Sequence, residues 1–174
     1  MRDDPQSLLS SDRIQTEVSN MLTRRNIKGD NEVWESKEPV ECLWSFVRND
    51  YTVVCVAVMN KENTETILHA AEGTQLIVIY MDKCTPAATK LIRTKPATEI
   101  WSAKEMCVHP FKFAFIKDAG VMQRPLPKES DMFAKLHKDD PLSHYLGAEI
   151  GDVVWCEIVW GALGPSISNR VVVK

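Results

Sequence analysis

The first apolar pattern of the chain lies between residues 10 and 25 and has the spacing of a helix. Its apolar residues stand four, three and one positions apart on one helical face: Ile14, Val18, Met21 and Leu22. Two serines and an aspartate precede them, and these residue types commonly cap helix N-termini. We therefore expect a helix that ends near Arg24 or Arg25, followed by a polar, charged loop over residues 28–41.

Runs typical of strands and of helices alternate between residues 42 and 104. CLWSFV and YTVVCVAV are β-rich and flank Arg48-Asn49-Asp50, which has hairpin length. NKENTETILHAAEG predicts a helix that Gly73 ends, and QLIVIY predicts a buried strand. Thr85-Pro86 is typical of a helix start, and EIWSAKEMCV indicates a further short strand or helix. This alternation predicts an α/β layer structure.

The pattern changes after residue 104. FKFAFI alternates phenylalanine with Lys and Ala, which predicts a strand with one buried face, and His109 stands at its start. Residues 117–131 contain Gly and Pro without periodicity and predict a linker or extended loop. After the Asp140-Pro141 turn, LSHYLG predicts a helical turn that Gly147 ends, and VVWCEIVW and VVV predict strands. We expect two domains, α/β over residues 1–104 and small α+β over residues 105–174.

Composition restricts the function classes. The 174 residues are 44% hydrophobic, which is enough for a buried core, and 21 Lys+Arg against 24 Asp+Glu give a formal charge of -3. A chain with this balance does not grip nucleic acid alone, so any DNA contact must be local. The start lacks the apolar core of a secretion signal, and apolar runs such as 51–59 are too short to cross a bilayer. We expect a soluble intracellular protein with no membrane partner.

The residue types that carry chemistry are scattered. The five cysteines are odd in number and form no C-x-x-C pair: Cys42, Cys55, Cys84, Cys107 and Cys156. We expect buried reduced thiols and neither a metal nor another cofactor. Cys107 and His109 lack the third group that orients a nucleophile, and Asp139-Asp140 before proline is typical of a capped turn. We therefore expect no catalytic residues.

The last forty residues carry a resemblance to a known family. KLHKDDPLSHYLGAEIGDVVWCEIVWGALGPSISNRVVVK is similar to the C-terminal end of the fifth subunit of eukaryotic-type DNA-directed RNA polymerases, a family that has a shorter archaeal relative. The residues that match this family without a gap are Lys135, Leu136, Asp140, Pro141, Tyr145, Gly147, Gly151, Val153, Val154, Gly164 and Arg170. Upstream, TQLIVIYMDKCTPAATKLI resembles the family's strand, loop and helix, with Ala87 in place of a serine.

The resemblance implies an α/β jaw domain followed by a small α+β assembly domain. The chain would then be a non-catalytic polymerase subunit that binds the largest subunit and other subunits and contacts downstream double-stranded DNA. Nucleotide addition would belong to other chains. The residues expected at the partner interface are His144, Tyr145, Trp155, Trp160 and Arg170. The terminal VVVK would add an exposed edge strand.

The chain also departs from the family pattern. FKFAFIKDA replaces the family's H-x-L-V-P-x-H segment, His144 replaces an arginine, and IVWGALG replaces a run rich in polar residues. These changes indicate a changed partner, as in a lineage-specific or large-DNA-virus polymerase. The expected location is the nucleus for a cellular polymerase, and a virion or a cytoplasmic viral factory for a viral one.

Cations near one helix start are the candidates for DNA contact. The candidate residues are Lys83, Thr85, Pro86, Lys90 and Arg93, with Lys95 beside them. Free N–H groups at a helix N-terminus favour phosphate, and such contacts carry no base specificity. The alternative is a solvated helix face with an ordinary cap.

Two other functions stay open at this point. A nuclease of the restriction type needs an aspartate ahead of an E-x-K strand end to hold Mg²⁺, and Glu35-Ser36-Lys37 has these letters with Asp30 before it. This segment lies in the expected loop and lacks the strand. A free-standing protein-interaction adaptor would use the same surface as the polymerase subunit.

Overall fold

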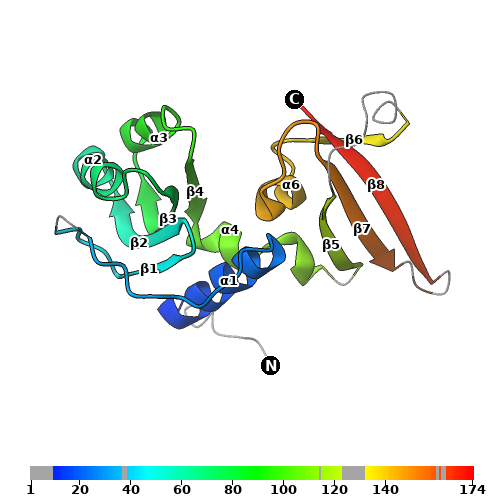
Figure 1. Cartoon of the computed structure of the whole chain (residues 1–174), viewed down its shortest axis with the longest axis horizontal. Coiled ribbons are helices and arrows are strands. Elements are labelled where there is room, and N and C mark those ends of the chain that lie inside the picture. The colour runs from blue at the N-terminus through cyan, green and yellow to red at the C-terminus, as the bar shows by residue number, and fades with distance from the viewer. Residues whose placement is uncertain (1–9, 37–38, 114, 123–131, 160, 162–163) are drawn as a thin grey trace. The chain divides into compact units, whose positions relative to one another are not determined.

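The computed structural model describes residues 10–36, 39–113, 115–122, 132–159, 161 and 164–174. It has a mixed α/β fold with two four-stranded sheets, each combining parallel and antiparallel neighbours (Figure 1). The chain divides into two compact units. Unit 1 comprises Met1–Ser19 and Ile27–Cys107, and unit 2 comprises Asn20–Asn26 and Val108–Lys174.

The elements follow the chain in the order α1 (Ser11–Arg24), β1 (Trp44–Arg48), β2 (Tyr51–Met59), α2 (Lys61–Ala70), β3 (Gln75–Cys84), α3 (Pro86–Ile92), β4 (Thr98–Ser102), α4 (Ala103–Cys107), a 3-10 helix (Pro110–Lys112), β5 (Ile116–Met122), β6 (Ala134–His137), α6 (Pro141–Leu146), β7 (Val153–Val159) and β8 (Pro165–Val173). The predicted boundary between residues 104 and 105 lies inside α4.

The sheet of unit 1 has the strand order β1-β2-β3-β4. β1 and β2 form the predicted antiparallel hairpin, whose turn contains Asn49 at φ 54°. β2, β3 and β4 are parallel neighbours, and α2 and α3 are the helices that connect them. Parallel strands require such crossover connections, so the alternation in the sequence determines this layout.

The apolar core of unit 1 explains why β2 and β3 read as continuous hydrophobic runs. Val54 and Val78 belong to a buried cluster that also contains Ile67 of α2 and Ile92 of α3. Both helices therefore cover the same face of the sheet, as Figure 1 also shows. The residues that alternate with these valines, such as Ile77, are also buried. A strand buried on both faces loses the polar alternation of a half-exposed strand.

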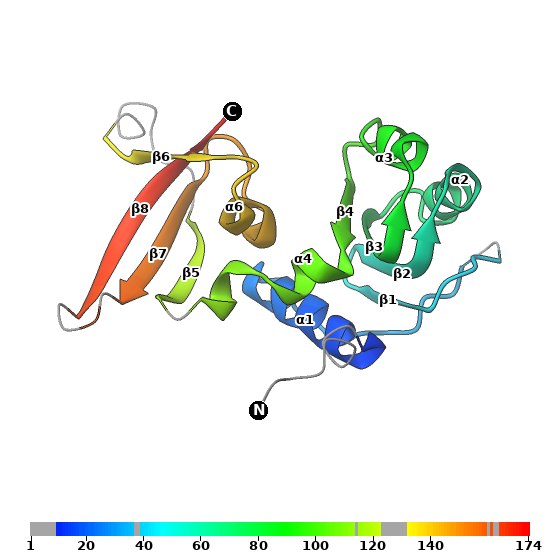
Figure 2. The ribbon, with the colours of Figure 1, turned by 180° about the vertical axis from the view of Figure 1, so that it is seen from behind.

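The sheet of unit 2 has the strand order β5-β7-β8-β6 (Figure 2). β7 pairs antiparallel with β5 and β8, whereas the short β6 pairs parallel with β8. α6 begins at Asp140, whose Oδ1 accepts the Leu142 N–H at 2.8 Å. It ends at Gly147, which is left-handed with φ 64°. The predicted Asp-Pro turn, helical turn and terminating glycine are confirmed.

Several sequence-based expectations about unit 2 are wrong. FKFAFI does not form a strand: Pro110–Lys112 is a 3-10 helix that follows His109, and Phe113 and Phe115 are 47% and 46% exposed. The predicted loop over 117–131 is wrong for its first part, which belongs to β5; residues 123–131 lie outside the described residues.

The terminal VVV forms the predicted strand, but it is not at an edge. Within β8, Arg170–Val173 has β7 on one side and β6 on the other.

Candidate nucleic-acid and partner surfaces

The N-terminus of α3 is built by Thr85 and Pro86. Thr85 Oγ1 accepts the Ala88 N–H at 3.3 Å, and the Thr85 N–H donates to the Met59 carbonyl at 2.9 Å. Pro86 occupies the first helical turn, where its missing N–H costs nothing. These contacts fix the junction between β3 and α3, so Thr85 acts first as a cap.

The cations near α3 do not all lie at its N-terminus. Lys83 is exposed near the end of β3, just before the cap. Lys90 and Arg93 lie in the last turn and at the C-cap, so they neighbour the carbonyl end of the helix. Cations at this end stabilise a helix through its dipole. The predicted cluster around one N-terminus is therefore wrong for Lys90 and Arg93, whereas it holds for Lys83, Thr85 and Pro86.

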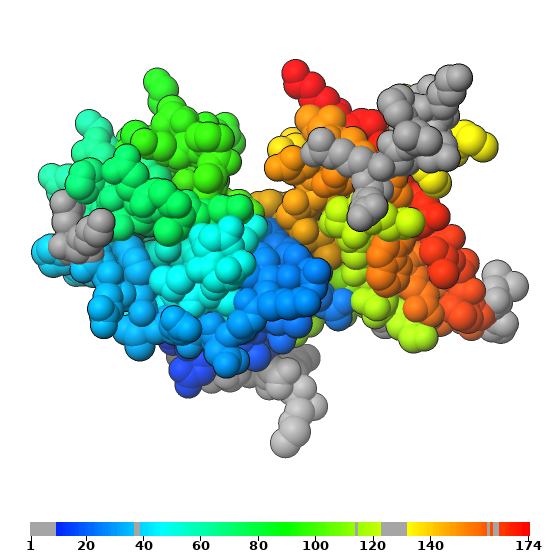
Figure 3. All heavy atoms as spheres, in the orientation of Figure 1, coloured from blue at the N-terminus to red at the C-terminus, as the bar shows by residue number. Residues whose placement is uncertain are grey.

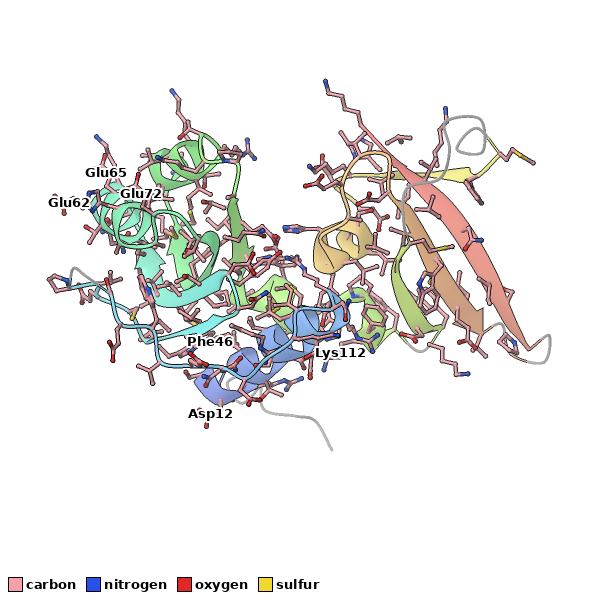
Figure 4. The ribbon with its side chains drawn as sticks, viewed as in Figure 1. Asp12, Phe46, Glu62, Glu65, Glu72 and Lys112 are labelled. Carbon is pink, nitrogen blue, oxygen red and sulfur yellow. The ribbon has the colours of Figure 1, made fainter. Side chains whose placement is uncertain are left out.

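The atoms of α3 form part of the exposed surface of unit 1 (Figure 3). Lys83, Lys90 and Arg93 are exposed and form no ion pair within the described part of the chain. The adjacent α2 region differs in charge, because Glu62, Glu65 and Glu72 gather there and are exposed (Figure 4). The surface that could attract phosphate is thus restricted to α3 and the end of β3.

The five predicted interface residues of unit 2 do not form one surface. Cross-strand register places Trp155 with Asn169 on one face of the sheet, and Val154 with Arg170 on the other. His144 is exposed on α6, whereas Tyr145 is completely buried and offers no side-chain surface to a partner. Trp160 lies outside the described residues.

The face that carries Trp155 is apolar and accessible. The Trp155 ring lies against Gly120 of β5, where a Cβ would come within 2.8 Å of Nε1. Ile167, on the same face of β8, is 72% exposed, and Met122 is 47% exposed. The sequence pattern did not identify Ile167, because it is a single apolar residue among serines and prolines. An exposed isoleucine beside an aromatic ring is typical of a partner surface.

Two arginines at the end of α1 belong to unit 2 and were also missed. Arg24 Nη1 pairs with Asp118 Oδ1 at 2.9 Å, and its guanidinium lies 3.7 Å from the centroid of the Phe111 ring. Arg25 donates from Nε to the Tyr145 carbonyl at 3.0 Å and from Nη2 to the His144 carbonyl at 2.8 Å. Arg25 therefore satisfies carbonyl groups at the C-terminus of α6, which a helix leaves without intrahelical partners.

An aromatic cluster lies beneath these arginines. The ring of buried His109 stacks on Tyr145 at 4.7 Å between centroids, and Phe111 packs against Tyr145 at 5.4 Å. His109 was expected to start a strand but instead precedes the 3-10 helix. The histidine is thus part of the core of unit 2. Cys107 is buried in α4 and belongs to unit 1.

The remaining candidates have structural roles. Asp140 caps α6, and Asp139 Oδ2 lies 3.7 Å from His137 Nδ1. Glu35 and Asp30 lie in a segment without strand structure, and Lys37 is outside the described residues. Across the described ranges, no group of three or more His, Cys, Asp or Glu side chains could hold a metal ion.

The thiols are free, as predicted, but only some are fully buried. Cys55, Cys107 and Cys156 are buried, and Cys42 and Cys84 are half-buried. Burial raises the pKa of the Cys55 thiol from 9.0 to about 12, and the nearby Cys42 thiol adds to this rise. Burial likewise raises the pKa of Cys156, although Arg170 opposes the rise. Thiols with raised pKa values are poor nucleophiles.

Comparisons with known proteins leave the chain without an assigned relative. No family model matches it, and no curated protein matches it. Among the described helices, none is long and apolar enough to cross a membrane.

Proposed function

We propose that this chain is a non-catalytic subunit of a multisubunit DNA-dependent RNA polymerase, equivalent to the fifth subunit of the eukaryotic-type enzymes. The proposal rests on the ungapped motif between Lys135 and Val154. In this stretch Asp140 caps α6, Gly147 ends it with φ 64°, and Gly151 turns with φ 93°. Motif residues with such conformational roles support the view that the shared spacing reflects a shared local structure.

The proposed role of unit 2 is to bind the largest subunit. Trp155 and the exposed Ile167 support this role, because they present apolar surface on one face of the sheet. The proposed role of unit 1 is to contact downstream DNA through Lys83, Lys90 and Arg93. Nucleotide addition would belong to other chains. The complex would work in the nucleus, or in a virion or cytoplasmic viral factory if the polymerase is viral.

The test is co-purification from the native source. We expect the tagged chain to retain the largest polymerase subunit in stoichiometric amount, as measured by native mass spectrometry. The Ile167→Glu variant should lose this subunit, because a carboxylate on the Trp155 face would be desolvated at an apolar interface. Val33→Glu is the matched control, since Val33 is 85% exposed in unit 1.

Two results would contradict the proposal. A monodisperse chain that binds no large polymerase subunit would exclude the assembly role. Stable retention of a different protein would favour a free-standing adaptor. Circular dichroism of both variants checks that the substitutions leave the fold intact, which we expect because both side chains are exposed.

A further inference from the structure

A groove runs over the face of the unit 2 sheet that is opposite Trp155. Its volume is about 300 Å³, and its apolar wall includes Phe113, Phe115, Ile116, Leu136 and Ile158. This volume is at the small end of the range for ligand pockets, so it suits one or two side chains better than a large cofactor. We call it the Phe115 groove. All of its lining residues belong to unit 2.

Two aromatic side chains of the groove are exposed. Phe113 and Phe115 stack with 5.7 Å between ring centroids, yet they are 47% and 46% exposed. Each large apolar side chain that stays in contact with water forgoes a stabilisation of roughly 1.5–3 kcal/mol that full burial would give. A pair of rings next to a concave apolar surface is therefore a site where a partner gains by covering it.

The groove also has a defined charge. Arg170 lines it from β8 and is exposed, and within the described residues its side chain makes a long hydrogen bond, from Nε to Ser168 Oγ at 3.4 Å. Asp140 lines the groove too, but its Oδ1 already accepts the Leu142 N–H at 2.8 Å. The guanidinium is thus the polar group with bonding capacity left for a ligand, and it favours a carboxylate.

We propose that the Phe115 groove binds a short segment of a partner protein in which an aliphatic or aromatic side chain stands next to an aspartate or glutamate. The apolar side chain would enter between Phe115 and Ile158, and the carboxylate would pair with Arg170. This interaction goes beyond the assembly role proposed above, because it uses the opposite face of the sheet and requires no other polymerase subunit.

Fluorescence anisotropy with the full-length chain tests this proposal. The probes are three labelled peptides: one rich in leucine, phenylalanine and aspartate, one with lysine in place of aspartate, and one with serine in place of the apolar residues. We expect the acidic apolar peptide to bind, and the other two to bind at least about tenfold more weakly, because one loses the charge pair and the other the apolar contact.

Matched variants assign the binding to the groove. Arg170→Gln should weaken the acidic apolar peptide by about tenfold, whereas Lys135→Gln should leave it unchanged. Lys135 is an exposed cation of the same sheet, and it alternates with Leu136 of the groove, so it lies on the opposite face. Phe115→Ser should weaken the acidic apolar peptide as well. Ile167→Glu, which disrupts the proposed assembly face, should not affect it, so the two proposals can fail separately.

The outcomes are decisive in both directions. Equal affinity for the aspartate and lysine peptides, or equal effects of Arg170→Gln and Lys135→Gln, would overturn the carboxylate pairing. Absence of binding by the acidic apolar peptide would overturn the proposal as a whole. Binding of a small apolar dye without binding of that peptide would do so as well, because it would make the groove a small-molecule pocket.

Discussion

Gly147 and Gly151 share a left-handed backbone but differ in their surroundings. Gly147 has φ 64°, and a Cβ there would lie 3.1 Å from the guanidinium of Arg25. Gly151 has φ 93° with nothing within 4 Å of its Cβ position. A side chain at either residue strains the backbone, but only at Gly147 would it also press on a group that closes α6.

We therefore expect Gly147→Val to lower the free energy of unfolding by roughly 1–3 kcal/mol, and Gly151→Val to lower it by less. Urea unfolding followed by circular dichroism measures both values. Melting of both variants like the unmodified chain would show that these turns tolerate side chains. An equal loss would show that Arg25 moves aside without cost.

The Cys55 thiol gives the fold a dependence on alkaline pH. Its pKa is raised from 9.0 to about 12 in the folded chain. A raised pKa means that the folded state holds the thiol proton more tightly than the unfolded state does, so this contribution to stability is complete below pH 9 and is lost between pH 9 and about 12. The raised pKa values of Cys156 and Tyr80 act in the same direction.

We expect the urea midpoint to fall as the pH rises above 9, and to fall less in Cys55→Val, which removes the titrating group at similar volume. Folded protein should also react slowly with iodoacetamide at Cys55 compared with half-buried Cys84. Identical pH profiles for the two proteins would show that Cys55 is not the group that titrates.

Functional residues were harder to predict than structural ones. The pattern at Thr85-Pro86 and at Asp140-Pro141 identified caps correctly, because a cap depends on neighbours within a few positions. The interface set failed as a single surface, since Trp155 and Arg170 lie on opposite faces of a sheet whose register the sequence does not specify. Tyr145 is buried for the same reason, because its partners His109 and Phe111 are distant in sequence.

At the level of elements, local chemistry explains both the successes and the failures. α2 was predictable because Asn60 and Asn63 cap one another reciprocally at 3.0 and 2.9 Å and Gly73 follows at φ 89°. FKFAFI was misread because its alternating phenylalanines match a strand, whereas Pro110 begins a 3-10 turn. In this segment the rings serve an aromatic cluster and an open groove rather than one buried face.

β5 was missed because it lacks the hydrophobic alternation of a half-buried strand. It is an edge strand, and Ala119 is its one buried residue. Asp118 accompanies a register shift in its pairing with β7, and Gly120 makes room for the Trp155 ring. Glycine and charge within such a run normally indicate a loop. Its strand structure follows from pairing with β7, which is distant in sequence.

At the scale of the whole molecule, the proposed DNA contact depends on assembly. The formal charge is -3, and the acidic residues of α2 neighbour the cations of α3, so the free chain should hold DNA poorly. Within a polymerase, the duplex would already be gripped by other subunits. Lys83, Lys90 and Arg93 would then add phosphate contacts without base specificity.

We expect the triple substitution of Lys83, Lys90 and Arg93 by Ala to leave folding and incorporation intact and to weaken the grip on downstream duplex. The loss should be similar for unrelated DNA sequences and larger at low salt, because each lost phosphate contact removes about one released counterion from the salt slope. The lifetime of stalled elongation complexes across a salt series measures this. An unchanged lifetime and slope would identify these residues as a solvated helix face.

The two hydrogen bonds from Arg25 to the end of α6 also have a consequence for the order of folding. They join residues 119 and 120 positions apart, and Asn20–Asn26 forms one unit with Val108–Lys174. During synthesis, the segment with Arg25 leaves the ribosome long before the helix whose carbonyls it will bind. Unit 1 can therefore begin to collapse during translation, while unit 2 must wait for a long loop to close, a slow step that favours chaperone binding in the interval.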